Sequence, residues 1–445
     1  MNMKTMLCVA TAALSTSLMA TDTPEVSNVV MAQANFGRKV TITYDLSNAA
    51  NGAVVTLDIE TNKTGAATNV DSDWVSIGGA AVCNAQGDVW KKVSQGSKTI
   101  TWRPDHSWEG HKVELANGGA RAVVTAWALD NTPDYMVVDI SATGGEGTQR
   151  YYPAADFLPG GVANVLYKTG TLLMRKIMAK DVTWMMGSVA ESGRDATREK
   201  PHQVTLTNNY YIGVYLVTQT QWQQIAGYNP SDFKTEGSMR PVEKVCYRDI
   251  RQGKGTASAS ASAMGGVYPA DPYGESFLGL LRDKTKLDFD LPSEAQWEFA
   301  ARAGNGEGYW GDGSAMQISS GKDTSLDLLG RYLNNPTSNS TTSPDATIVP
   351  ADGGTAIVGS YAPNAWGLYD VHGNVWEWCL DTFAEDITAL NGAVNTTASG
   401  MDRMRRGGSW KDAAGSCRPA NRAVNAAANR YNTFGLRLLC FAGLR

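Results

Sequence analysis

Two carboxylates and a glycine turn share one short run of the sequence, Gly367–Trp378, which reads GLYDVHGNVWEW. Asp370 and Glu377 supply hard oxygen ligands, and the turn at Gly373–Asn374 can direct backbone carbonyl groups inward, a combination that suits calcium. Three aromatic residues crowd the same run, and neither helix nor strand periodicity produces such a density. We therefore expect a tightly folded loop with buried rings. Its acids either bind a cation or accept backbone hydrogen bonds.

A second run whose residues could serve a function is 411–433, KDAAGSCRPANRAVNAAANRYNT, which has almost no large apolar residues. Small polar side chains with a few Tyr and Arg anchors are typical of recognition loops. We expect a ligand-binding surface there, and an ordinary Ala/Asn-rich surface loop is the alternative. The expected contact residues are Asp412, Ser416, Asn421, Asn425, Asn429, Arg430, Tyr431 and Asn432.

Bulk composition limits the functions that the protein can have. The 445 residues suffice for two or three domains, and 46 glycines with 19% charged residues favour β structure and long ordered loops. The formal net charge is −5 and the pI is near 5.5. Nucleic acid is excluded as a partner, because phosphate contacts need a basic face.

The first twenty residues, MNMKTMLCVATAALSTSLMA, have the form of a secretory signal peptide. Their apolar stretch is too short to span a bilayer, so we expect no membrane span after signal removal. The mature protein is expected to be secreted, periplasmic or held at the cell surface. It keeps five cysteines, an odd number in an oxidising compartment, so at least one is free or bonded to another chain.

Residues 21–142 contain six short runs rich in Val, Ile and Thr, separated by Asn, Gly, Asp and Pro. Their regular spacing predicts an antiparallel β-sandwich of immunoglobulin or fibronectin type. The runs are VSNVVMAQ, KVTITYDLS, AVVTLDIETN, KTITWRP, RAVVTAWALD and DYMVVDISA. The Gly-rich stretch TGGEGTQR opens a linker and lead-in over residues 143–174, and a second domain follows over residues 175–445.

Two helices stand out in the second domain. The first covers TQTQWQQIAGY, with Thr218 or Thr220 as its N-cap. The second covers PSEAQWEFAARAG, where Ser293 caps the start and Gly304 ends the helix. Short strands and long loops are expected elsewhere, which makes the domain α+β.

Six motifs in this domain resemble, in the same order, the family of formylglycine-generating enzymes, or sulfatase-modifying factors. They are REKPHQVTLTNNYYIGVYLVTQTQW, RPVEKVCYRDI, LPSEAQWEFAARAG, GLYDVHGNVWEWC, RRGGSW and FGLRL. The resemblance implies a variant of the C-type lectin fold. It also places the family's calcium ligands on Asp370, Gly373, Val375 and Glu377, two through side chains and two through carbonyl groups.

The family's enzymes oxidise a cysteine of a client sulfatase with copper(I) held by two thiolates just after the GGS motif. Here only Cys417 is present, and Asp412 stands where the first thiolate is expected. A carboxylate is a poor ligand for copper(I), which prefers soft thiolates. Cys417 is therefore expected to form a disulfide, with Cys379 as partner, or to remain a buried thiol.

Two functions follow from the resemblance. The favoured one is a calcium-stabilised, exported module that binds a protein or a surface ligand through residues 411–433. Variable proteins of diversity-generating retroelements resemble this arrangement, because they use the same lectin-like fold and vary the same C-terminal segment. The alternative is an oxidase of protein cysteines, with Cys417 as the remaining copper ligand and Ser409 and Trp410 lining the site.

Overall fold

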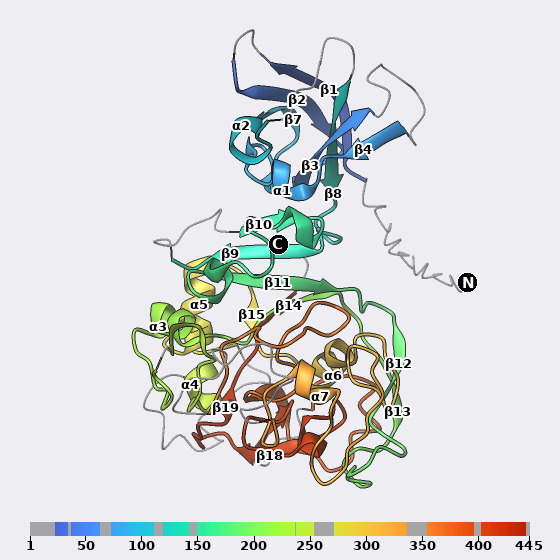
Figure 1. The fold of residues 1–445 in the computed structure, drawn as a ribbon, viewed down its shortest axis with the longest axis vertical. Helices are drawn as coiled ribbons and strands as arrows, with labels where there is room; N and C mark the ends of the chain where they lie inside the picture. Colours follow the sequence, from blue (N-terminus) through green and yellow to red (C-terminus); the bar gives the residue numbers. More distant parts are fainter. Residues whose placement is uncertain are drawn as a thin grey trace, which may run out of the picture.

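The computed structural model describes residues 23–33, 37–62, 73–110, 119–141, 149–235, 237–252, 271–335, 354–395 and 402–441. The expected signal peptide, residues 1–20, lies outside these ranges. In Figure 1 a small β-rich part at the N-terminal end stands on a larger mixed part that holds most of the helices. No helix within the described ranges is long and apolar enough to cross a membrane.

The N-terminal part consists of two antiparallel sheets. The first has the order β1-β2-β7-β5, and in the second β3 pairs with β4, β6 and β8. Strand β2 alternates buried and exposed side chains, as expected where one face of a sheet meets a core. The strands are β1 (Glu25–Gln33), β2 (Val40–Ser47), β3 (Ala53–Asn62), β4 (Trp74–Ser76), β5 (Gln86–Gly87), β6 (Lys91–Val93), β7 (Gly96–Trp102) and β8 (Ala120–Trp127), with short helices α1 (Gly79–Val82) and α2 (Pro104–Ser107).

All six runs predicted as strands are strands, but the last one belongs to a different sheet. DYMVVDISA contains β9 (Tyr135–Asp139), which pairs with β10 (Gln149–Tyr152) and β11 (Thr171–Ile177). These strands lie in a six-stranded sheet of order β10-β9-β11-β14-β20-β15. The predicted sandwich boundary at residue 142 is therefore wrong.

Strand β9 could not serve as an outer strand of the sandwich, because both of its faces are covered. Met136 and Val138 belong to one buried cluster, whereas Tyr135 and Val137 belong to another. Successive side chains of a strand point to opposite faces, so β9 separates two cores. A strand buried on both faces reads as a continuous apolar run, and MVV is such a run.

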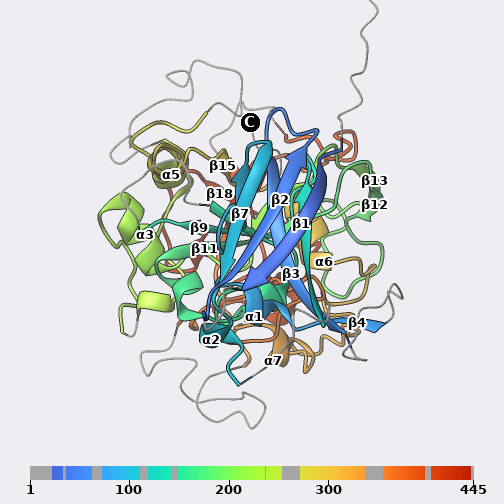
Figure 2. The same cartoon turned by 90° about the horizontal axis from the view of Figure 1, so that it is seen from above.

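The stretch predicted as a linker is mostly structured. Residues 142–148 lie outside the described ranges, but β10, two 3-10 helices and the start of β11 occupy residues 149–174. These helices are η3 (Ala155–Phe157) and η4 (Val165–Lys168). Tyr152 stacks on Trp90 of the N-terminal part with ring centroids 5.2 Å apart, and a Cβ atom at Gly79 would lie 2.4 Å from the Phe157 ring. The two parts are therefore packed together rather than joined by a free tether, and Figure 2 shows β1, β2 and β7 lying over the larger part.

Both predicted helices are present with their predicted N-caps. Helix α3 (Gln219–Ala226) begins after Thr218 and helix α6 (Glu294–Arg302) after Ser293, and each start forms a reciprocal capping box with a glutamine three residues on. Helix α6 ends at Ala303 in the left-handed region, one residue before the predicted Gly304. The other elements of the larger part are α4 (Tyr247–Arg251), α5 (Phe277–Thr285), α7 (Leu326–Leu329), η5 (Gly237–Met239), η7 (Ala414–Cys417), β12 (Thr183–Met186), β13 (His202–Thr205), β14 (Tyr210–Gly213), β15 (Phe289–Asp290), β16 (Trp376–Thr382), β17 (Asp402–Arg406), β18 (Ala423–Ala426), β19 (Phe434–Gly435) and β20 (Leu439–Phe441).

Candidate functional site

The C-terminal loops are positioned by a four-stranded sheet of order β18-β17-β16-β19. After β17 the chain turns at Gly407 and Gly408, whose φ angles are 95° and 73°. A Cβ atom at Gly408 would lie 2.6 Å from Cys417 Sγ, so both the conformation and the close approach require glycine. This turn places the next residues, 409–412, against the first residue of β16.

Ser409, Trp410 and Asp412 are all held by hydrogen bonds. Trp376 Nε1 donates to Asp412 Oδ2 at 2.9 Å, and Ser409 Oγ donates to the same oxygen. Trp410 Nε1 donates to the backbone oxygen of Asn432 at 3.0 Å. The carboxylate at the expected thiolate position therefore organises the loop instead of offering a soft ligand.

Cys417 is not placed to bind copper. Its side chain is fully buried, and burial raises the pKa of the thiol well above its ordinary value. Copper(I) binds the thiolate form, which this environment disfavours. Within the described residues, no three His, Cys, Asp or Glu side chains gather into a group that could hold a metal ion. The residues present do not fit the family's copper site.

The expected disulfide between Cys417 and Cys379 is wrong. Both are free thiols, as are the other cysteines in the described ranges, Cys83, Cys246 and Cys440. Cys379 packs in the cluster that contains Trp297, whereas Cys417 packs in a separate cluster with Trp310. Each sulfur is enclosed by a different core. Cys417 is therefore a buried thiol, which was the other expected state of this residue.

The arginines of residues 411–433 that point inward tie this segment to the rest of the domain. Arg418 Nη1 lies 2.7 Å from a Glu191 oxygen and 2.8 Å from a Glu199 oxygen. Arg422 contacts both oxygens of Glu294, at 2.7 and 2.8 Å. All of these side chains are buried, so the segment is fixed from beneath by charged hydrogen bonds.

The same network continues through helix α6. Arg406 contacts Glu294 at 2.9 Å and Glu298 at 3.1 Å, and Arg302 contacts Glu298 at 2.8 Å. Burial alone would raise the pKa of Glu294, but Arg422 and Arg406 hold it below its ordinary value. The buried carboxylates are matched one for one by arginines, four of each: Glu191, Glu199, Glu294, Glu298, Arg302, Arg406, Arg418 and Arg422.

The expected contact residues all keep part of their surface open to solvent. Tyr431 is 52% exposed and its ring lies 4.9 Å from the ring of Phe434. Asn429 and Asn425 are hydrogen-bonded to each other, and Arg430 contacts Asp249 at 2.6 Å. We call the full set the display residues; none of them is buried: Asp412, Ser416, Asn421, Asn425, Asn429, Arg430, Tyr431 and Asn432.

Arg405 is a part of this site that the sequence did not reveal. Its guanidinium lies 3.9 Å from the ring centre of Phe434 and 5.0 Å from that of Trp376. Burial lowers the pKa of Arg405 to about 10, with Asp412 and Tyr431 acting in the opposite direction. Arg405 lies opposite Trp378 in the β16–β17 pairing, and this pairing is visible only in three dimensions. The stack of rings and guanidinium forms a rigid floor beneath Tyr431.

The two carboxylates predicted as calcium ligands, Asp370 and Glu377, are already engaged in hydrogen bonds. Asp370 Oδ2 accepts from the Gly359 N–H at 2.7 Å and Oδ1 from Asn374 at 3.2 Å. Glu377 is bound by Arg437 through both oxygens, at 2.9 and 3.0 Å. An arginine at this distance already neutralises the carboxylate and repels a cation.

Glu377 also accepts from Trp297 Nε1 at 2.8 Å. The carbonyl ligands expected at Gly373 and Val375 lie in the same enclosed loop, where both residues are buried. The four residues therefore do not fit a calcium site in this arrangement. Asp370 accepts a backbone hydrogen bond, as the alternative expected, whereas the donors to Glu377 are side chains.

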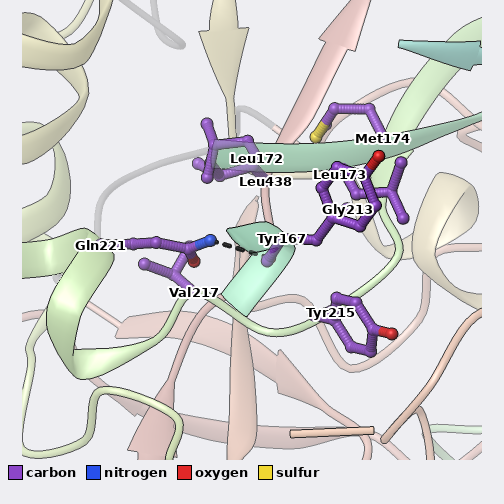
Figure 3. Close-up of a pocket in the computed structure, with 9 residues that line it drawn as sticks. All are labelled: Tyr167, Leu172, Leu173, Met174, Gly213, Tyr215, Val217, Gln221 and Leu438. Carbon is purple, nitrogen blue, oxygen red and sulfur yellow. Dashed lines mark hydrogen bonds between the residues drawn. The ribbon is translucent and has the colours of Figure 1, made fainter. Parts of the chain in front are cut away.

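A small cavity beneath the N-terminal part is a feature of the interior and not of a binding surface. Figure 3 shows its lining, which comes mainly from β11, β14 and η4. The amide of Gln221 is committed to the backbone oxygens of Tyr167 and Thr171. A volume of about 10 Å³ holds at most one water molecule, so this space belongs to the interior packing.

Comparison with known proteins agrees with the geometry. Residues 163–441 match the family described as the sulfatase-modifying factor enzyme 1-like domain. The chain belongs to this family. Its match begins in the stretch expected as a linker, which agrees with the structured lead-in seen in the fold. From here on, residues 163–441 are called the sulfatase-modifying-factor domain.

Relatives of this domain carry different names. The chain is 27% identical to the chaperone protein LppX of Paenibacillus barcinonensis over 246 residues, which cover 52% of this chain and 79% of that one. It is 38% identical to the formylglycine-generating enzyme of Streptomyces coelicolor over 125 residues, 27% of this chain and 35% of that one. The match therefore spans about a third of that enzyme's length. Since one fold hosts several functions, the function must be argued from the site.

Among solved structures, the Treponema denticola variable protein 1 is similar, with 27% identity and a TM-score of 0.42. The match covers 61% of this chain and 95% of that one.

Proposed function

We propose that the protein is an exported recognition protein in which the sulfatase-modifying-factor domain binds a protein or surface ligand through the display residues. The observation that carries this proposal is that residues 411–433 fall into two groups, one buried and one open to solvent. Arg418, Arg422 and Cys417 are buried and anchored, while every display residue stays partly open to solvent.

This division suits recognition, because the anchored segment is already ordered before a ligand binds. A surface that is rigid before it meets its ligand loses less conformational entropy in the complex. The display residues combine adaptable amides with the exposed ring of Tyr431, and such mixtures are typical of binding surfaces. The relative named a chaperone supports a binding role for this kind of domain.

The N-terminal sheets suit a supporting role in this proposal. We assign them to an immunoglobulin- or fibronectin-type sandwich, exported with the help of residues 1–20. Their core is continuous with that of the larger part, since one buried cluster contains both Leu57 and Tyr215. They therefore hold the recognition surface at a fixed orientation.

Site-specific photocrosslinking tests the proposed surface. A benzoylphenylalanine in place of Tyr431 or Asn425 is expected to crosslink a surface component of the producing cell. The same group in place of Lys180, which is exposed and lies in the turn between β11 and β12, is expected to give no such product. Equal labelling from all three positions, or none from positions 425 and 431, would contradict the recognition role.

Thiol and copper measurements test the alternative oxidase. In the native mature protein, Ellman's reagent is expected to react rapidly with the half-buried Cys83 and slowly with the four buried thiols. Anaerobic copper(I) titration of the protein and of Cys417→Ala is expected to show no difference. A tight stoichiometric site that disappears in Cys417→Ala would instead establish the oxidase chemistry.

A further inference from the structure

A pocket of about 360 Å³ opens in the sulfatase-modifying-factor domain, and it shares no residue with the display residues. Five segments meet around it: residues 205–208 at the end of β13, residues 290–296 from β15 into α6, Leu380 of β16, the loop 391–394, and β20. Its volume lies within the range of small-molecule sites, roughly 300–1,000 Å³. The candidate is therefore a site for a small ligand.

The pocket offers no free charge to a ligand. Asp290 is the one ionisable residue among the described residues that line it. Its carboxylate is bound by Arg251 through both oxygens, each at 2.9 Å, and by Arg282 at 3.2 Å. A charged ligand would lose its hydration without gaining a counter-charge, so the pocket favours an uncharged one.

Two side-chain amides present fixed donors at the wall of the pocket. Gln296 Oε1 accepts from the Ser293 N–H at 2.9 Å as part of the α6 capping box. Asn391 Oδ1 accepts from the Thr205 N–H at 3.1 Å. Each bond fixes the amide plane through its oxygen and leaves the NH₂ group without a partner among the described residues.

The remaining lining combines a hydrogen-bond acceptor with apolar surface. Asn208 donates through Nδ2 to Thr207 Oγ1 at 3.0 Å, which leaves its Oδ1 as an acceptor. Leu439 and Leu206 supply buried apolar surface, and Phe441, which is 47% exposed, also lines the pocket. An apolar body, a ring and a few oriented polar groups make up the usual composition of a ligand site.

We propose that this pocket binds an uncharged sugar unit of a glycan. Sugar hydroxyl groups both donate and accept hydrogen bonds, which matches two fixed NH₂ donors and one amide oxygen. The apolar face of a pyranose ring packs against an aromatic ring, which Phe441 provides. Uronic acids and amino sugars are expected to bind more weakly, because no described lining residue has a charge to spare.

Saturation-transfer NMR and calorimetry on the intact mature protein test the assignment. The probes are glucose, galactose, N-acetylglucosamine and their uncharged oligomers, with glucuronate and glucosamine as charged counterparts. At least one neutral probe is expected to bind in the millimolar range or tighter, with an affinity insensitive to added salt.

The capping geometry supplies well-matched variants. Gln296→Glu keeps the oxygen that caps the helix, since glutamate serves at this capping-box position, but it removes the NH₂ donor. Asn391→Asp does the same for the bond to Thr205. Each change is expected to weaken sugar binding by at least about tenfold, or about 1.4 kcal/mol, without loss of folding.

Gln223→Glu controls for the added charge. Gln223 is an exposed residue of α3 outside the pocket lining, and this variant is expected to bind like the unmodified protein. Failure of every neutral sugar to bind would overturn the proposal, as would binding that is unchanged in both Gln296→Glu and Asn391→Asp. Binding of an uncharged peptide such as N-acetyl-trialanine amide in place of any sugar would also overturn it. None of these outcomes bears on the display residues, because the two surfaces share no residue.

Discussion

Replacing Arg418 with alanine is expected to lower the free energy of unfolding by about 3–5 kcal/mol, as in other cases where one partner of a buried ion pair is removed. Arg418 lies between Glu191 and Glu199, and all three side chains are fully buried. Without the guanidinium, two carboxylates would remain in an apolar environment with too few donors. Urea unfolding followed by tryptophan fluorescence measures the loss.

Two further variants show whether the geometry of Arg418 matters. Arg418→Lys restores the charge but not the planar fork that reaches both glutamates, so it is expected to recover only a small part of the loss. Lys200→Ala removes an ion pair of similar length, 2.7 Å to Asp386, in which both side chains are about half exposed. It is expected to change stability little. A loss in Arg418→Ala no larger than in Lys200→Ala would show that the buried network does not anchor residues 411–433.

Replacing Glu377 with glutamine is expected to cost a similar amount, about 3–5 kcal/mol. Glutamine keeps the shape of the side chain but removes the charge that Arg437 needs. Arg437 is fully buried and also donates to the backbone oxygens of Gly213 and Tyr369. An uncompensated guanidinium would therefore remain where β14, β16 and the run 367–378 meet. Thermal and urea unfolding measure the effect.

The double variant Glu377→Leu with Arg437→Met separates an ion pair from a metal site. Removing both charges is expected to be less destabilising than removing Glu377 alone, because no unpaired charge is left. Excess EDTA or added calcium is expected to leave the unfolding curve of the unmodified protein unchanged. A calcium-dependent rise in stability that is lost in Glu377→Gln would instead restore Glu377 as a metal ligand.

Local patterns predicted the elements of this protein well. Alternating runs identified six strands, and two N-caps, Thr218 and Ser293, identified two helix starts, because capping and periodicity are local physical effects. The six ordered motifs also led to the correct family and fold. The exposed character of Tyr431 and its neighbours followed from their composition.

Long-range pairing was not accessible in the same way. Nothing next to Tyr135–Asp139 shows that this strand pairs with β11, since the pairing depends on residues some 35 positions away. The sequence around Glu377 suggested a metal ligand because it does not show the partner of this carboxylate. That partner, Arg437, lies 60 residues further along the chain. Glu191 and Arg418 are separated by 227 residues, so their mutual neutralisation appears only in three dimensions.

The position of β20 has a consequence for folding during synthesis. This strand is the last of the described strands in sequence order, yet it lies between β14 and β15 inside the six-stranded sheet. The sheet can therefore close only after residue 441 has left the ribosome. A prematurely terminated chain would lack an inner strand and would expose the edge of β14. Proteases that degrade unfolded chains would then remove such incomplete molecules.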